Sequence, residues 1–129
     1  MEPVKIVLVD DDEGICDSLA KILTKKGYHV APFVSGMKAL KSMKKSSYDI
    51  LLTDLKMPEM NGIELLKEAR AIDPELGVII MTGFGEITSY LEAMDLGAAE
   101  YLNKPIKSHE LELIIKKLTK GKEESLETC

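Results

Sequence analysis

The chain has 129 residues, of which 45% are apolar, enough for one domain with a buried core. Its formal net charge of -5, from 22 acidic and 17 basic residues, excludes the overall positive charge on which nonspecific nucleic-acid binding depends. The apolar runs are shorter than the roughly 20 residues that span a bilayer, and the N-terminus does not resemble a secretion signal. We expect a cytoplasmic protein that contacts neither membrane nor nucleic acid directly.

Five short apolar segments have the pattern of strands. The first, Val4 to Val9, combines β-branched residues with leucine and ends at a run of aspartates, as in a strand buried on both faces. Pro32 weakens the second, because proline cannot donate a hydrogen bond to a neighbouring strand. The predicted strands are residues 4–9, 28–33, 48–53, 77–82 and 100–103.

Each predicted strand is followed by residues at the three- and four-residue spacing of a helical face. Cys16 lies within the first helix and is expected to be a packed thiol. Ser108 is the predicted N-cap of the last helix, Gly27 and Gly97 suit left-handed helix ends, and Asp73-Pro74 closes the third helix. The five faces comprise Ile15, Leu19, Ile22 and Leu23; Met37, Leu40 and Met43; Ile63, Leu66, Ala69 and Arg70; Ile87, Tyr90, Leu91 and Met94; and Leu111, Ile114, Ile115 and Leu118.

This alternation of strands and helices predicts an α/β domain with a five-stranded parallel sheet, doubly wound, with helices on both faces and right-handed crossovers. In such sheets ligands bind beyond the carboxyl ends of the strands, where the strand order reverses. The residues that follow the strands are therefore the candidate site.

Polar side chains follow four of the predicted strands. Several carboxylates in one crevice repel each other, and the usual remedy is a hard divalent cation with oxygen ligands, here Mg²⁺. A hydroxyl and a lysine facing that cation suit a phosphoryl group, and a neighbouring aspartate can act as nucleophile. The residues are Asp10, Asp11 and Asp12 after the first strand, Asp54 after the third, Thr82 and Gly83 at the fourth, and Lys104 and Pro105 after the fifth.

Four motifs lie at these strand ends in order: LVDDDEG, LLTDLKMPEMNG, IIMTG and GAAEYLNKPI. Through them the chain resembles, over residues 4–118, the receiver domain of two-component response regulators. The phrases MTGFGEI and GAAEYLNKPI are most similar to receivers of NtrC-like transcription regulators. The resemblance implies a flavodoxin-like fold with strand order 2-1-3-4-5.

The resemblance also implies a role for each strand-end residue. Asp54 would accept a phosphoryl group from a histidine kinase or phosphotransfer protein. The Mg²⁺ ligands would be Asp11, Asp54 and the backbone carbonyl of Lys56, with Asp10 holding metal-bound water. The phosphoryl oxygens would contact Lys104, the Thr82 hydroxyl and nearby N–H groups such as that of Gly83. Tyr101 would turn inward when Thr82 moves.

Further expectations concern the surroundings of the site. Asp12 has no ligand role in the family, so capping of the first helix is favoured over metal contact. The family has a cis bond at the position of Lys104-Pro105. Phe84 is expected to screen the acyl phosphate from water. By family resemblance, a kinase would dock on Gly14, Ile15 and the Pro105 loop.

The resemblance implies an output through the fourth helix, last strand and last helix, through which the chain could form a homodimer. The full-length protein could also carry an ATPase and DNA-binding output domain. Residues 1–118 are the expected receiver domain, and residues 119–129 a charged tail or the start of a linker. Beyond its own phosphorylation and dephosphorylation, we expect no enzymatic activity.

Two alternatives remain. Asp10 and Asp12 also fit a haloacid-dehalogenase-like phosphatase, with Asp10 as nucleophile and Asp12 as acid/base, and with Thr82 and Lys104 as later motifs. That family needs a further acidic pair after the lysine, and here Glu110 alone follows nearby. The other alternative is a receiver-like interaction module that is never phosphorylated.

Overall fold

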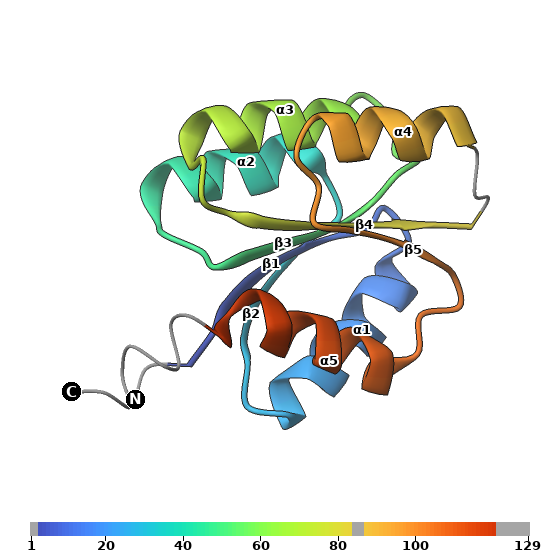
Figure 1. Cartoon of the computed structure of the whole chain (residues 1–129). Helices are drawn as coiled ribbons and strands as arrows, with labels where there is room; N and C mark the ends of the chain where they lie inside the picture. The colour runs from blue at the N-terminus through green and yellow to red at the C-terminus, as the bar shows by residue number, and fades with distance from the viewer. Residues whose placement is uncertain (1–2, 84–86, 121–129) are drawn as a thin grey trace.

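The computed structural model describes residues 3–83 and 87–120, which form five strands alternating with five helices (Figure 1). The strands are β1 (Lys5–Val9), β2 (His29–Phe33), β3 (Ile50–Asp54), β4 (Gly77–Thr82) and β5 (Glu100–Asn103). The helices are α1 (Glu13–Lys25), α2 (Gly36–Lys45), α3 (Gly62–Ile72), α4 (Ile87–Asp95) and α5 (Ser108–Leu118). The predicted strands and helices are confirmed. Of the predicted tail, residues 121–129 lie outside the described part, as does Phe84.

The strands form one parallel sheet in the order β2-β1-β3-β4-β5, which confirms the expected order. The order reverses at β1, because the chain passes from β1 to β2 on one side and returns to β3 on the other. Val9 at the end of β1 lies opposite Thr53 near the end of β3. The register therefore brings Asp10 and Asp54 to neighbouring positions at the switch point.

The sheet is covered on both faces. Helices α2, α3 and α4 lie on one face and α1 and α5 on the other (Figure 1). Val7 and Val9 pack into the core beneath α2 and α3, whereas Ile6 and Leu8 pack into the core beneath α1 and α5. Burial of these side chains holds the strand ends, and the residues attached to them, in fixed positions. None of the described helices is long and apolar enough to cross a membrane.

Local sequence accounts for several element ends. Asn61 and Glu64 form a reciprocal capping box at the start of α3. Gly27 and Gly97 have φ values of 98° and 97°, as expected for left-handed helix ends. Pro32 lies in β2, an edge strand of the five-stranded sheet, where its missing donor is tolerated.

Cys16 is buried, and burial raises the pKa of its thiol, so the expected packed thiol is confirmed.

The predicted N-cap of α5 is wrong, and the apolar face of α4 is largely exposed. The N-cap of α5 is Lys107, whose backbone is extended, and Ser108 is already the first helical residue. On the predicted apolar face of α4, Tyr90, Leu91 and Met94 are 45%, 60% and 37% exposed, whereas small Ala93 is buried in the core beneath α2, α3 and α4. We call these three exposed residues the α4 surface.

Arg70 of α3 is a half-buried residue that joins three segments. One guanidinium nitrogen, Nη1, donates hydrogen bonds to the carbonyls of Pro74 and Leu76, at 2.8 and 2.6 Å. The other, Nη2, donates to the carbonyl of Gly97 at 2.6 Å. Arg70 thereby satisfies carbonyls in the α3–β4 loop and just beyond α4, which otherwise depend on water.

Candidate functional site

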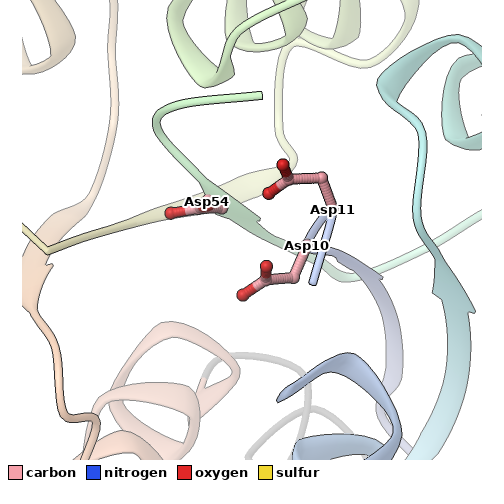
Figure 2. A group of neighbouring side chains, drawn as sticks. All are labelled: Asp10, Asp11 and Asp54. Carbon is pink, nitrogen blue, oxygen red and sulfur yellow. The ribbon is translucent and has the colours of Figure 1, made fainter. Parts of the chain in front are cut away.

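Three carboxylates converge where β1 and β3 end. Asp10 is fully buried, Asp54 is 8% exposed as the last residue of β3, and Asp11 is exposed. Ligand oxygens from the three side chains all lie within 4.8 Å of one another (Figure 2). The expected meeting of the acidic residues is confirmed, and their oxygens are close enough to share one small cation.

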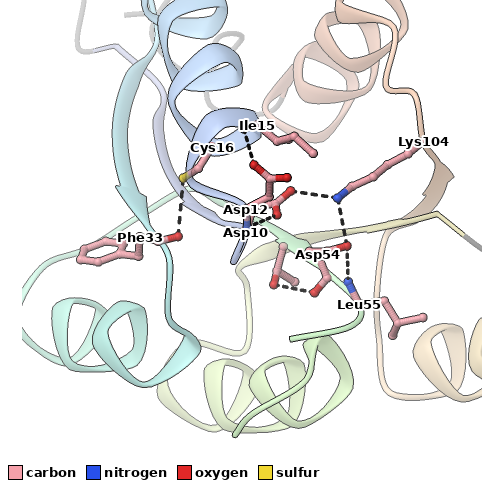
Figure 3. A network of polar contacts seen from close by, with 9 residues as sticks. Asp10, Asp12, Ile15, Cys16, Phe33, Asp54, Leu55 and Lys104 are labelled. Atoms are coloured by element: carbon pink, nitrogen blue, oxygen red, sulfur yellow. Dashed lines mark hydrogen bonds and ion pairs between the residues drawn. The ribbon is translucent and has the colours of Figure 1, made fainter. Parts of the chain in front are cut away.

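Lys104 supplies positive charge to this cluster. Its Nζ lies 2.9 Å from Asp10 Oδ2 and 3.3 Å from Asp54 Oδ1 (Figure 3). The backbone N–H of Lys104 also donates to the carbonyl of Thr82, which fixes the start of the β5–α5 loop against β4. The Lys104-Pro105 bond is cis, as the resemblance implies.

The surroundings of the site shift the pKa values of Asp54 and of Lys104, which form an ion pair. Burial raises the pKa of the Asp54 carboxyl, the Lys104 charge opposes that rise, and the Asp10 charge adds to it. Burial by itself would lower the pKa of Lys104, but its hydrogen bond with Asp10 and the charges of both aspartates outweigh burial and raise it. Lys104 is therefore fully charged at neutral pH, and Asp54 carries a carboxylate that its surroundings only partly stabilise.

The three consecutive aspartates divide their roles. Asp12 Oδ1 accepts a hydrogen bond from the Ile15 N–H at 3.1 Å, so Asp12 is the N-cap of α1 (Figure 3). The Asp12 N–H in turn donates to Asp10 Oδ1 at 3.0 Å. The expectation that Asp12 belongs to the helix is confirmed, and its backbone helps orient Asp10.

The loop after Asp54 is shaped by backbone constraints. Asp54 Oδ1 accepts from the Leu55 N–H at 3.0 Å. The Met60 N–H donates to the Pro58 carbonyl at 2.7 Å across Glu59, whose φ of 69° is typical of a γ-turn. A Cβ added to Gly62 would lie 2.5 Å from the backbone oxygen of Asp54. The Asn-Gly signal predicted a turn but did not reveal this close approach.

The remaining predicted residues lie at the ends of strands, in the loop after Asp54 and in β5. Thr82 is buried at the end of β4, the strand next to β3, and Gly83 is exposed just beyond it. Lys56 is exposed in the loop after Asp54. Tyr101, in β5, packs against the core beneath α2, α3 and α4, and its hydroxyl is buried. These positions leave the family roles of the four residues as predictions.

The arrangement is an acidic pocket that could hold a cation. The carboxylate oxygens of three residues are ligand atoms of the kind that hard divalent cations prefer. Lys104 adds a fixed positive charge beside Asp54, a carboxylate able to act as nucleophile. Fold and site together define a doubly wound α/β protein with an acidic, lysine-containing pocket at the switch point of its sheet.

Comparison with known proteins identifies the family. The family model for the response regulator receiver domain matches residues 6–116. The chain belongs to this family.

Among curated relatives, a transcriptional regulatory protein ZraR from Klebsiella oxytoca is 39% identical over 88% of this chain. The chain spans only 26% of that protein's length. Sporulation initiation phosphotransferase F from Bacillus subtilis is also 39% identical over 88% of the chain, but here the match covers 91% of the relative. The family thus occurs both within longer regulators and as proteins of about this length.

Solved structures agree with the fold. A response regulator receiver domain from Clostridium thermocellum superposes with a TM-score of 0.88 at 33% identity, covering 93% of this chain and 97% of that one. The beryllofluoride-activated NtrC4 receiver domain, solved as a dimer, gives 0.85 at 30% identity, covering 91% and 97%. The second match is consistent with the resemblance to NtrC-like receivers.

Proposed function

We propose that this chain is a phosphoacceptor receiver in which Asp54 takes a phosphoryl group from a phosphohistidine of a kinase or phosphotransfer protein. The observation that carries the proposal is the contact of Asp54 with Lys104 inside the cluster that also contains Asp10 and Asp11. An Asp54 carboxylate oxygen forms a bond to phosphorus while the bond from phosphorus to the histidine nitrogen breaks. The transfer is a phosphoryl exchange, with no other substrate consumed.

Mg²⁺ is the cofactor we propose, held by Asp11, Asp54 and the Lys56 carbonyl, with Asp10 in support. Bound there, it supplies positive charge to oxygens that carry spread negative charge during phosphoryl transfer. Lys104 would contact the same phosphoryl oxygens. The Thr82 hydroxyl and the Gly83 N–H are proposed donors from the neighbouring strand.

A groove beside the pocket suits the phosphodonor. It has a volume of about 790 Å³ and is lined by α1 and the start of the β5–α5 loop. Ile15 and Ile22 expose apolar side chains there, at 41% and 40%, while Lys104 and Pro105 form its end nearest Asp54. We propose that the phosphohistidine partner docks in this groove, because a partner seated there lies beside the acceptor carboxylate.

The proposed output passes through α4, β5 and α5. The α4 surface exposes three large apolar residues, which is a common property of contact surfaces. We propose that phosphorylation changes dimerisation through this region in the cytoplasm. We further propose that residues 1–118 are the receiver unit, and that in a longer protein this unit would control an ATPase and DNA-binding domain.

Trapping of the acyl phosphate tests the proposal. After treatment with acetyl phosphate and Mg²⁺, borohydride reduces an aspartyl phosphate, and peptide mass spectrometry locates the altered residue. We expect the label on Asp54 and its loss in Asp54→Asn. Label on Asp10 would favour the phosphatase-like alternative, and complete absence of label would favour the unphosphorylated interaction module.

The phosphatase alternative gains no support from the site. That mechanism needs Asp12 as acid/base, but the Asp12 carboxylate caps α1 through the Ile15 N–H. The family match likewise is to receivers.

A further inference from the structure

Two tyrosines connect α4 to β5. The rings of Tyr90 in α4 and Tyr101 in β5 have centroids 5.6 Å apart and planes at 87°, an edge-to-face arrangement. This geometry is favourable because the positive edge of one ring faces the negative face of the other. Tyr90 is 45% exposed, so its ring contacts Tyr101 on one side and solvent on the other.

The hydroxyl of Tyr101 is in an unfavourable position. It is buried and has no hydrogen-bond partner among the described residues. A hydroxyl removed from water without a replacement partner destabilises the conformation that buries it. Rotation of the ring outward would return the hydroxyl to water but would break the contact with Tyr90.

We propose that Tyr90 is a positioning residue that holds Tyr101 in its inward position against the penalty of the buried hydroxyl. The inference rests on the proposed function, in which Tyr101 is the switch aromatic. The ring contact and the unpaired hydroxyl act in opposite directions and are of similar size. The ring contact thus offsets the penalty of the buried hydroxyl, and a change that removes it shifts the populations toward the outward position.

The pairing also gives the switch a direct connection to the α4 surface. Tyr90 belongs to that surface together with Leu91 and Met94. A partner that holds Tyr90 in its present place therefore favours the inward position of Tyr101 as well. Because such coupling is reciprocal, inward Tyr101 also favours the binding of that partner.

Fluorine NMR of the unphosphorylated protein tests this role. The chain has four tyrosines, so 3-fluorotyrosine labelling gives four resonances, and that of Tyr101 is assigned by its loss in Tyr101→Phe. The shift difference between H₂O and D₂O reports exposure of the ring. In Tyr90→Ala we expect the outward-to-inward ratio of Tyr101 to rise about fivefold, the equilibrium effect of losing an aromatic pair. In Tyr90→Phe, which keeps the ring, we expect the original ratio.

Leu91→Ala is the matched control, because it removes a more exposed apolar side chain from the same surface. An unchanged shift difference between H₂O and D₂O for Tyr101 in Tyr90→Ala, or an equal change in Leu91→Ala, overturns the inference. Should Tyr90→Ala fail to fold, Tyr90→Leu, which keeps apolar volume without a ring, gives the same comparison. Borohydride trapping at Asp54 in the same variants reports the proposed function separately, since the ring populations are measured without phosphorylation.

Discussion

The ammonium group of Lys104 lies closer to Asp10 than to Asp54, with Nζ to oxygen distances of 2.9 and 3.3 Å. Asp10 is buried, so Lys104 neutralises a charge that is largely removed from bulk water. Lys104 therefore stabilises the acidic pocket in addition to the contact with the phosphoryl group that we propose.

Lys104→Met should lower the free energy of unfolding by about 2 kcal/mol at pH 7. This loss is smaller than the loss expected on breaking a fully buried ion pair, because Lys104 is partly exposed. Its folded-state pKa is raised, so its contribution is complete below the unfolded pKa of about 10.4 and is lost as pH rises through the folded pKa. Urea unfolding at pH 7 measures the loss. Lys107→Met, at an exposed lysine of the same loop, is the control and should change stability little.

Asp54→Asn should stabilise the chain at pH 7 by roughly 1 kcal/mol, the scale of a typical single substitution, because it removes a carboxylate from a shared buried site. The raised pKa of Asp54 means that, between its unfolded and folded pKa values, the folded state binds more protons. Stability of the wild type therefore falls as pH rises through that window. The stability advantage of Asp54→Asn over the wild type should therefore shrink as pH falls through and below this window. An advantage that grows on acidification contradicts this account.

Millimolar Mg²⁺ should raise the melting temperature by several degrees, because at the proposed site it would bind only the folded state and offset the repulsion among the three carboxylates. Thermal melts with and without Mg²⁺ measure this shift. Asp11→Ala should remove most of it, whereas Asp17→Ala, at an exposed carboxylate of α1, should retain it. A rise that survives in Asp11→Ala means that the ion acts elsewhere.

Gly62→Ala should destabilise the chain by about 2 kcal/mol, since the new Cβ would lie 2.5 Å from the backbone oxygen of Asp54 and the loop must shift. Chemical denaturation gives the value. Gly83→Ala is the comparison, because a Cβ at Gly83 meets nothing within 4 Å and stability should stay nearly constant. Equal destabilisation at the two glycines would contradict an explanation based on contact with Asp54.

Thr82→Ala should still accept a phosphoryl group at Asp54 but lose the accompanying change in dimerisation. The proposed reason is that its hydroxyl connects the phosphoryl oxygens to the rest of β4 and to Tyr101. Sedimentation velocity with and without acetyl phosphate and Mg²⁺ measures the change. Thr82→Ser keeps the hydroxyl and should retain the response, while a full response in Thr82→Ala rules out this coupling.

The sheet and the acidic pocket were predictable because both depend on where apolar runs end. Buried parallel strands need residues that are apolar on both faces, so the change from Val9 to Asp10 marks a strand end directly. Five alternating units then leave the carboxyl ends on one edge. The sequence alone therefore predicts that Asp10, Asp54 and Lys104 lie together.

The contacts that depend on packing depth could not be predicted in this way. Periodicity assigned Tyr90 to an apolar face, but it did not show that Tyr90 is 45% exposed beside Tyr101 while small Ala93 is buried. The sequence likewise marks Gly62 as a turn residue without showing that the carbonyl of Asp54 lies against it. Both features depend on how far apart the elements lie in space, and the spacing of residues along the chain does not specify that distance.

Arg70 gives α4 one end that is anchored. Its bond to the Gly97 carbonyl ties the chain just after α4 to α3, so a reorientation of α4 is expected to pivot about that end. The nine residues of α4 extend about 13 Å, and a tilt of about 10° would move the opposite end by roughly 2 Å. That far end is the one that follows Thr82 and Gly83 along the chain. The displacement of α4 would therefore be largest at the end nearest in sequence to the proposed switch residue.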